Sequence, residues 1–520
     1  MSAVRNVLFI MCDQLRADHL GCYGHPFLAT THLDELARRG VRFDRAFVQS
    51  GVCGPSRMSF YTGRYVSSHG ATWNRVPLSV GEITLGEYLR RAGRTLSLAG
   101  KTHVMPDLAG IARFHLDGDD EWMRLIRAGG FDELDRHDGH HPEPDGAYAA
   151  YLRRAGYEST DPWSDFVISA IDEQGKVVSG WNMRNARLPA RVAEEHSETA
   201  YTTERAIEFM RARGDAPWAL HLSYVKPHWP YLAPAPYHAR YSLDQCLAVK
   251  RDPRELDDAH PVLAAYRKQE ECANFMRDEV WRTVRPAYQG LVKQIDDHLG
   301  RVWETLERLG RWKDTLIVFT ADHGDFLGDH WLGEKEHFYD TVQRVPLIVY
   351  DPDSAADATR GRVETRFAEG VDIAPTILDA LELPDSAERI EGRSLLALTR
   401  GVEVSEWRDC VFSELDYGYR EARRILGREP DHCRAWMVRT GRWKYVFWQD
   451  LAPQLFDLES DPDEYNDLGR DSGFERVRGE MRERLLAWFM RLKRRVTVTD
   501  NEVDAATAAH KRAGVFFGQW

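Results

Sequence analysis

The sequence has no apolar run that approaches the roughly 18 residues a bilayer-spanning helix needs. Its seven cysteines follow no paired or regular spacing, which excludes a disulfide framework and a zinc ribbon. Basic residues are outnumbered by acidic ones, 69 to 82, and the formal charge is −13. This balance argues against a general nucleic-acid binder and leaves only a local basic cleft open. We therefore expect neither a membrane nor a nucleic acid as partner.

The N-terminal apolar stretch, Val7 to Met11, is too short for the apolar core of a secretory signal. No small-residue cleavage site follows it, so we expect a first strand of a cytoplasmic protein. The 520 residues suggest about two to four domains. The 16 Trp, 20 Tyr and 21 Phe residues supply enough apolar surface for a large core, which excludes disorder for most of the chain.

Short apolar runs alternate with segments of helical periodicity along most of the chain. The pattern predicts strands at 6–11, 95–99, 218–224, 315–320 and 346–350, and helices at 31–40, 83–92, 193–213 and 287–309. This alternation indicates an α/β fold with a doubly wound, mostly parallel sheet. Residues 107–165 and 231–258 are polar and irregular, and we expect loops and short helices that shape the mouth of a pocket.

The composition changes after residue 395 or so. Alternating patterns at 443–448 and 453–458 predict a small antiparallel sheet, and the charged helix predicted at 474–495 should pack on it. We therefore expect a catalytic α/β domain at 1–395, a small C-terminal α+β subdomain at 396–495 and a tail at 496–520. The tail ends in Val515-Phe-Phe-Gly-Gln-Trp520, and its aromatic side chains favour assembly into a dimer or tetramer.

Two carboxylates occupy equivalent places in this pattern, because Asp13 and Asp322 each follow a predicted buried strand. If these strands are parallel, both acids reach the carboxyl edge of the sheet, where ligands bind in such folds. With His323 they form a donor set suited to a divalent metal. The alternative is that each acid only caps a turn, which is common after strands. Polar residues follow Asp322 closely, and we interpret four of them as parts of a solvated loop: Asp325, Asp329, His330 and His337. Lys335 is the exception, for the reason given below.

Cys53 lies between two glycines, and a helix can begin at Ser56, just after it. Backbone N–H groups and the dipole at a helix N-terminus favour an anion there. Arg57 adds positive charge. These residues indicate that Cys53 is a nucleophile or a metal ligand in a pocket that accepts an oxyanion.

The segment Cys53-Gly-Pro-Ser-Arg57, followed by Thr62-Gly-Arg64, resembles the Cys-x-Pro-x-Arg signature of sulfatases, which belong to the alkaline phosphatase superfamily. Further segments resemble family landmarks in the expected order: Asn6–Gly24, Gly100–His103, Lys226–His228, Thr320–Gly324, Asp372–Thr376 and Leu455–Glu464. The likeness covers about residues 1–490 and is greatest to the branch of phosphonate monoester hydrolases and cytoplasmic arylsulfatases. It implies a large mixed, mostly parallel sheet sandwiched by helices.

The resemblance implies that Cys53 is oxidised to formylglycine by a formylglycine-generating enzyme. The aldehyde hydrates to a geminal diol, whose first hydroxyl attacks sulfur or phosphorus. The second hydroxyl then lets the covalent ester collapse to the aldehyde, so unmodified Cys53 should be almost inactive.

The resemblance also implies roles for other residues. One divalent metal per subunit would be held by Asp13, Asp322, His323 and the modified residue 53. The other implied roles are charge balance for Arg57 and Lys101, proton acceptance from the second hydroxyl for His103, contact with the substrate's nonbridging or leaving oxygens for His228 and Lys335, and substrate contact for Asn74.

The metal site departs from the pattern of many sulfatases, which carry Asp-Asp at the first position and Asp-Asn at the last. Here Gln14 follows Asp13 and His323 follows Asp322. A nitrogen ligand moves the preference toward Mn²⁺, with Zn²⁺ or Ca²⁺ as alternatives. The role of Gln14 stays open, since its amide also offers an oxygen.

Lys101 and His103 resemble the Lys-x-His pair of sulfatases, which phosphonate monoester hydrolases lack. We therefore expect small sulfate monoesters, of the aryl type, as substrates, with side activity on phosphonate monoesters and phosphodiesters. The first alternative makes phosphonate monoesters or phosphodiesters the main substrates. The second is a non-catalytic relative that binds anionic esters and keeps Cys53 as a thiol.

Overall fold

The computed structural model describes residues 4–116, 118, 120–139, 144–384, 388–516 and 518. Of the expected aromatic end of the tail, Phe517, Gln519 and Trp520 lie outside these residues. Within the described ranges, no helix combines the length and the apolar character that crossing a membrane requires.

A nine-stranded sheet forms the centre of the molecule, in the order β10-β2-β9-β8-β1-β7-β3-β4, with β11 also paired to β2. Its strands are β1 (Asn6–Asp13), β2 (Val41–Phe47), β3 (Leu96–Gly100), β4 (Asp132–Arg136), β7 (Ala219–Pro227), β8 (Thr315–Ala321), β9 (Arg344–Tyr350), β10 (Val363–Glu364) and β11 (Ala368–Glu369). Only β9 runs antiparallel to its neighbours, β2 and β8. The predicted large, mostly parallel sheet is therefore confirmed.

The inner strands lie where the sequence has apolar runs. Every residue of β1, β7 and β8 is buried, and a strand that is covered on both faces requires such a run. The edge strand β4 was not predicted and lies within residues 107–165, where we expected loops and short helices. Its sequence, Asp-Glu-Leu-Asp-Arg, carries no apolar run, since an edge strand is only partly covered.

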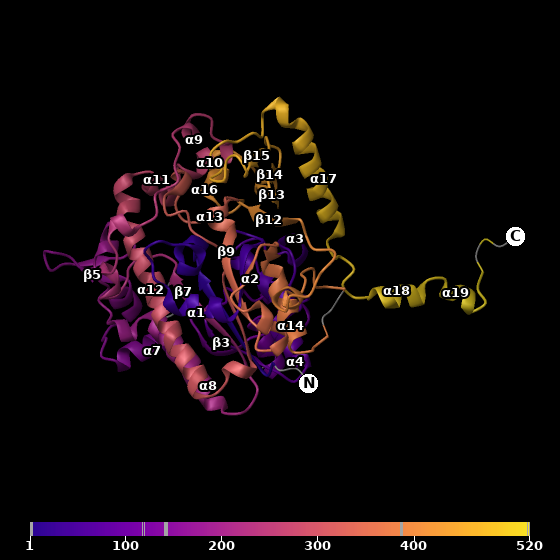
Figure 1. Cartoon of the computed structure of the whole chain (residues 1–520), viewed down its shortest axis with the longest axis horizontal. Helices are drawn as coiled ribbons and strands as arrows, with labels where there is room; N and C mark the ends of the chain where they lie inside the picture. The colour runs from indigo at the N-terminus through magenta and orange to yellow at the C-terminus, as the bar shows by residue number, and fades with distance from the viewer. Residues whose placement is uncertain are drawn as a thin grey trace.

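Helices cover both faces of the sheet (Figure 1). One layer contains α1 (Thr31–Arg39), α8 (Glu198–Arg213) and α12 (Asp278–Arg308), and the other contains α2 (Cys53–Thr62), α4 (Leu85–Arg91) and α14 (Ile373–Ala380). Helix α8 begins later than predicted because the Ser197 hydroxyl caps it by accepting from the Ala200 amide. Helix α12 begins earlier than predicted and continues through Pro286, which removes one backbone donor without ending a helix this well packed.

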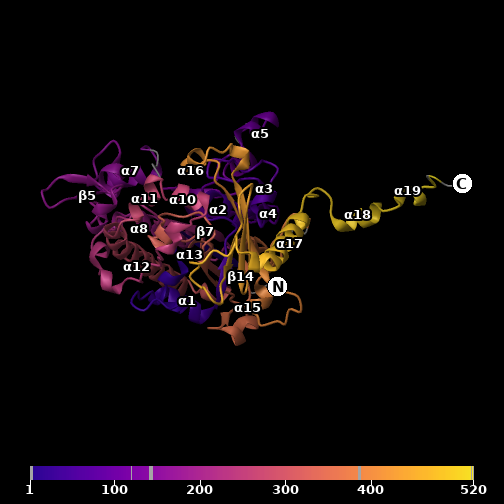
Figure 2. The same ribbon diagram turned by 90° about the horizontal axis from the view of Figure 1, so that it is seen from above.

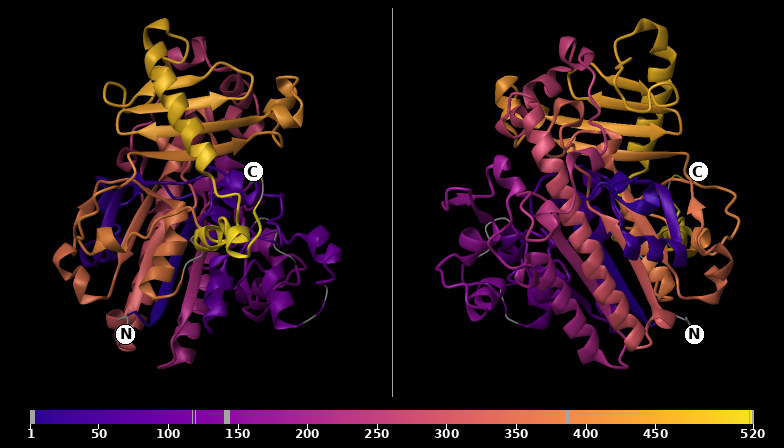
Figure 3. Two further views of the ribbon diagram at one scale, coloured as in Figure 1. Left: turned by 90° about the vertical axis from the view of Figure 1, so that its right-hand side faces the viewer. Right: turned by 60° about the vertical axis from the view of Figure 1, so that its left-hand side comes forward.

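A four-stranded antiparallel sheet lies beside the main sheet (Figure 3). It consists of β12 (Cys410–Asp416), β13 (Arg434–Thr440), β14 (Trp443–Trp448) and β15 (Gln454–Asp457). As expected, the helix α17 (Glu475–Arg491) packs on it: Trp488 stacks on Phe412 with ring centroids 4.7 Å apart. Trp488 also meets the edge of Tyr65 at 5.1 Å, which joins this sheet to the main body.

The remaining α-helices and strands are short and lie mainly in the connections. They are α3 (Val66–His69), α5 (Leu108–Arg113), α6 (Glu121–Arg127), α7 (Ala147–Arg154), α9 (Arg254–Asp257), α10 (Pro261–Tyr266), α11 (Glu270–Phe275), α13 (Asp340–Gln343), α15 (Leu396–Thr399), α16 (Glu421–Ile425), α18 (Asp500–Ala506), α19 (Ala509–Arg512), β5 (Ser169–Ile171) and β6 (Val177–Ser179). Helices α18 and α19 extend away from the rest of the molecule (Figure 2).

Candidate active site

Four neighbouring parallel strands of the sheet, β8, β1, β7 and β3, end at the same edge. Asp13 is the last residue of β1, and Asp322 follows β8 directly. His228 follows β7, and Lys101 follows β3. Strands β1 and β8 pair in register, so both acids reach the carboxyl edge of the sheet as expected. This edge is where doubly wound sheets bind ligands.

Cys53 is the first residue of α2, which begins earlier than the expected start at Ser56. Gly54 is required next to it, because a Cβ at this position would lie 2.9 Å from Asn74 Oδ1 and 3.0 Å from Asn74 Cα. The Gly54 amide donates to Asn74 Oδ1 at 2.7 Å, which satisfies one free donor of the first turn. The helix N-terminus adds a positive partial charge beside the Cys53 side chain.

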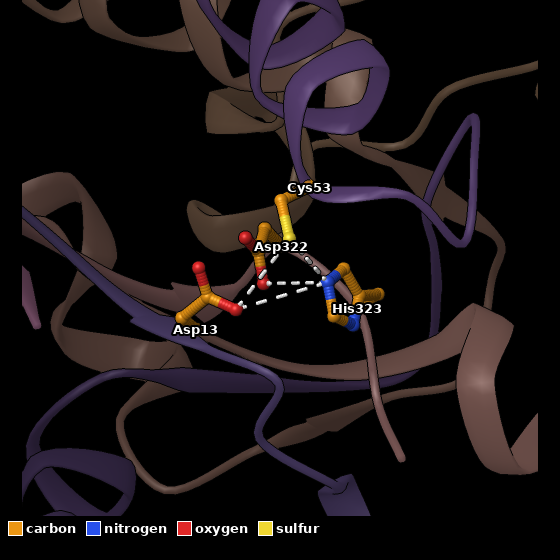
Figure 4. A group of neighbouring side chains, drawn as sticks. All are labelled: Asp13, Cys53, Asp322 and His323. Carbon is orange, nitrogen blue, oxygen red and sulfur yellow. Dashed lines mark hydrogen bonds and ion pairs between the residues drawn. The ribbon is translucent and has the colours of Figure 1, made fainter. Parts of the chain in front are cut away.

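Four fully buried side chains meet in front of this helix: Asp13, Cys53, Asp322 and His323 (Figure 4). Their ligand atoms all lie within 4.8 Å of one another. His323 Nε2 lies 3.2 Å from Cys53 Sγ, 3.8 Å from Asp13 Oδ1 and 3.6 Å from Asp322 Oδ1. The other ring nitrogen of His323 lies 2.8 Å from the Gly324 carbonyl oxygen, so Nε2 is the nitrogen that faces the cluster.

Arg57 and Lys101 hold the outer oxygens of the two acids. Arg57 donates to Asp322 Oδ2 at 2.7 Å and to Asp13 Oδ2 at 3.2 Å, and Lys101 Nζ lies 2.6 Å from Asp13 Oδ2. The Oδ1 atom of each acid is thereby left on the side of His323. Two carboxylates, an imidazole and a sulfur around one point fit a divalent metal, with a nitrogen donor that favours a transition metal.

Positive charge surrounds position 53. Burial raises the pKa of the Cys53 thiol, but Lys335, Lys101 and His323 outweigh burial and hold it well below its ordinary value. Burial and the charge of Lys335 lower the pKa of His228 to about 4. The site is therefore built to stabilise an anion at position 53 and at the groups bound there.

Lys335 completes the site on the side of the cavity. Its Nζ lies 3.1 Å from Cys53 Sγ and 2.7 Å from His228 Nε2. A hydrogen bond from the His103 side chain also lowers the pKa of Cys53. Behind His103, the carboxylate of Asp138 accepts from the His103 backbone amide at 3.2 Å and fixes the start of this loop. The structure thus brings Lys335, His228 and His103 together around position 53. Their chemical roles are still predictions.

Gln14, whose role the sequence left open, has its side chain held at both ends. Its Nε2 donates to Asp325 Oδ2 at 2.6 Å, and Tyr231 donates its hydroxyl to the same oxygen at 2.6 Å. The Gln14 amide oxygen accepts from Lys335 Nζ at 3.3 Å. Gln14 therefore connects the buried acid Asp325 to Lys335.

The interpretation of the segment after Asp322 as a solvated loop is wrong. The four polar residues interpreted in this way are at most 2% exposed: Asp325, Asp329, His330 and His337. Each has buried surroundings provided by distant parts of the chain. Arg16 and Arg285 bond Asp329, for example, at 2.7 and 2.5 Å. The polar composition was typical of a loop, but it does not reveal these long-range partners.

A cavity of about 910 Å³ opens in front of Lys335 and His228. Its walls are rich in aromatic side chains: Trp73, Trp181, Trp229, Tyr231, Phe275 and Tyr419. No described residue between 107 and 165 lines it, and Tyr231 is the one described residue of 231–258 that does. Among the described residues, the expectation that these two stretches shape the pocket is therefore met only by Tyr231. The stretch 107–165 instead supports the site from behind, through Asp138.

Sequence reasoning missed several residues of this cavity. Trp73 and Trp229 were recognisable by adjacency, because they lie next to the candidate residues Asn74 and His228. No sequence signal marks Arg420, which lines the cavity from the connection between β12 and β13. The strands β12–β15, their connections and α17 are called the small antiparallel sheet unit below.

The fold and this buried site define a hydrolase of the alkaline phosphatase superfamily. The profile described as "Sulfatase" matches residues 5–383, and the profile "N-sulphoglucosamine sulphohydrolase, C-terminal" matches residues 328–490. The chain belongs to the sulfatase family, and its relatives include arylsulfatases and phosphonate monoester hydrolases, which hydrolyse ester bonds. The resemblance stated from the sequence is therefore confirmed.

The chain is similar along nearly its whole length to three proteins of known name. The multifunctional alkaline phosphatase superfamily protein PehA of Trinickia caryophylli is 33% identical over 93% of this chain and 95% of its own length. The arylsulfatase of Clostridium perfringens is 27% identical over 89% of this chain and 90% of its own. The structure of the phosphonate monoester hydrolase of Silicibacter pomeroyi covers 96% of this chain and 98% of its own, with a TM-score of 0.83 and 29% identity.

Proposed function

We propose that the chain is a metal-dependent hydrolase of aryl sulfate monoesters, with side activity on phosphonate monoesters and phosphodiesters. The nucleophile is formylglycine formed from Cys53 by a formylglycine-generating enzyme. One observation supports this most: Cys53 begins a helix inside a buried cluster of two carboxylates and a histidine, with cationic side chains around it. A tetrahedral anionic ester needs such surroundings.

Asp13, Asp322, His323 and residue 53 would hold one divalent metal per subunit, with Mn²⁺ favoured over Zn²⁺ and Ca²⁺. When bound, the metal supplies Lewis acidity toward the ester and toward the attacking hydroxyl. The hydrated formylglycine supplies that hydroxyl, and its second hydroxyl allows release of sulfate by collapse to the aldehyde.

The remaining residues bind and move protons. Lys335 and His228 lie 2.7 Å apart at the cavity, where they contact nonbridging oxygens or donate a proton to the leaving oxygen. His103 holds the second hydroxyl and accepts its proton. Arg57 and Lys101 balance the negative charge of the acids and of the transferring group.

The aromatic walls of the cavity support an aryl group as the alcohol part of the substrate. A sulfate monoester and a phosphonate monoester both carry one negative charge, so the metal site alone discriminates them weakly. Lys101 and His103 resemble the Lys-x-His pair of sulfatases, and this resemblance favours the sulfate ester as the main substrate. The second candidate, phosphonate monoester hydrolysis as the main activity, is favoured by the structural likeness to the Silicibacter pomeroyi enzyme.

We expect the purified enzyme to have a higher kcat/KM for an aryl sulfate than for an aryl phosphonate monoester with the same leaving group. The comparison is made by steady-state kinetics on one metal-loaded preparation, so that modification and metal content are shared. The reverse order would establish the second candidate instead. Protein that keeps Cys53 as a thiol, binds no metal and turns over neither ester would instead support a non-catalytic relative that binds anionic esters.

We further propose a catalytic domain at 1–395, an α+β subdomain at 396–495 and an oligomerisation tail at 496–520. The antiparallel sheet and α17 lie within the second range, and the exposed helices α18 and α19 lie in the third. Val515 and Phe516, at the far end of the tail, are 45% and 54% exposed, which suits contact with a neighbouring subunit.

Truncation after Arg495 is expected to reduce the sedimentation coefficient from that of a dimer or tetramer to that of a smaller species. Analytical ultracentrifugation of both proteins measures this. An unchanged melting curve for the truncated protein would show that its core is intact. Equal molecular masses for the two particles, after allowing for the deleted residues, would refute the role of the tail.

A further inference from the structure

The loop that carries Lys335 has an unusual backbone. Glu334, Glu336 and His337 all have positive φ, at 57°, 79° and 48°, although none of them is glycine. Such residues are strained and persist only where their surroundings hold them. The position of Lys335 therefore depends on whatever fixes this loop.

The side chain of Arg420 contacts both glutamates that flank Lys335. Its Nε donates to Glu336 Oε1 at 2.6 Å, and its Nη2 donates to Glu334 Oε2 at 2.9 Å. Tyr266 donates its hydroxyl to the other oxygen of Glu336 at 2.5 Å. Both glutamates are buried, so one guanidinium fork bridges two negative charges that would otherwise repel each other.

Arg420 is itself fixed by aromatic packing. Its guanidinium lies 5.5 Å from the ring centroid of Trp73, and Trp73 stacks on Tyr419 with ring planes 4° apart. Arg420 follows β12, so it belongs to the small antiparallel sheet unit, whereas Lys335 belongs to the main domain. Arg420 and both glutamates also line the cavity in front of Lys335.

We propose that Arg420 is a positioning residue for Lys335. Its fork holds Glu334 and Glu336 in one arrangement and thereby keeps Lys335 Nζ 3.1 Å from position 53. The small antiparallel sheet unit thus completes the active site through the side chain of Arg420. This inference rests on the proposed function, in which Lys335 contacts the ester.

The test is a double-mutant cycle in the metal-loaded full-length enzyme, assayed with an aryl sulfate. We expect Lys335→Ala to lower kcat about 10²-fold, as loss of a group that contacts the transition state does. Arg420→Ala should lower kcat about 10-fold and affect KM less, because it moves Lys335 without removing a substrate contact. The double variant should fall no more than about 2-fold below Lys335→Ala, since coupled residues are not additive.

Two further measurements separate positioning from general stability. Millimolar guanidinium should restore part of the activity of Arg420→Ala but none of that of Lys335→Ala. Arg428→Ala is the matched control: Arg428 lies in the same unit and bonds the His432 and Gln449 carbonyl oxygens. Any loss it causes should multiply with that of Lys335→Ala and resist guanidinium.

The outcomes are distinguishable. Full activity of Lys335→Ala would overturn the proposed role of Lys335, whatever Arg420→Ala does. A large loss in Lys335→Ala together with an unaffected Arg420→Ala, or with losses that multiply, would overturn the positioning role alone. If Arg420→Ala does not fold, Arg420→Lys replaces it in the cycle: it keeps the charge but cannot reach both glutamates, and the same coupling is expected.

Discussion

Replacement of Cys53 by alanine is expected to lower kcat/KM for an aryl sulfate by at least about 10³-fold, because it removes the nucleophile. Cys53→Ser should lose turnover almost as completely. Its hydroxyl can form the covalent ester, but it lacks the second hydroxyl that drives collapse. Steady-state and burst kinetics measure both effects.

The same experiment includes a direct measure of the modification. Active wild-type protein should be about 18 Da lighter than its sequence mass, through loss of H₂S and gain of oxygen at position 53. The difference should be absent from Cys53→Ala and present in Cys246→Ala, a control in which a partly exposed cysteine is removed. Fully active protein with an unmodified thiol in the peptide that contains Cys53 would refute the formylglycine mechanism.

The sequence predicted the parts of the site that depend on local pattern. Asp13 and Asp322 were recognised because each follows a buried apolar run, and parallel strands end at one edge of a sheet. Cys53 was recognised because its signature is contiguous and begins a helix. Strand and helix order were predicted for the same reason, since hydrophobic periodicity is a local property.

The sequence did not predict the parts that depend on distant partners. Arg420 bonds Glu334, 86 residues earlier, and Arg16 bonds Asp329, 313 residues later. A polar residue after a strand has the same local pattern whether it meets water or a buried arginine. The strand β4 was missed for a related reason, because an edge strand acquires its partner only when the sheet forms.

Replacement of His323 by alanine is expected to remove most of the bound metal and to lower kcat/KM by at least about 10³-fold. His323 supplies the only nitrogen among the four side chains of the cluster in the described chain. Without it, the Oδ1 atoms of Asp13 and Asp322 lose the donor that selects a transition metal. Elemental analysis after dialysis measures the metal, and kinetics with added Mn²⁺ or Ca²⁺ measure the activity.

The control is His432→Ala, which removes a histidine 57% exposed at the surface of the antiparallel sheet unit and should leave metal content unchanged. Wild-type protein is expected to contain about one Mn²⁺ or another transition metal per subunit, whereas calcium alone would contradict the preference for a nitrogen donor. A His323→Ala protein with its full metal content would contradict the ligand set itself. In that case the closeness of His323 to Asp13 and Asp322 would reflect charge pairing. Burial lowers the pKa of His323, but Asp322 and Cys53 outweigh burial and raise it to about 9, which is consistent with such pairing.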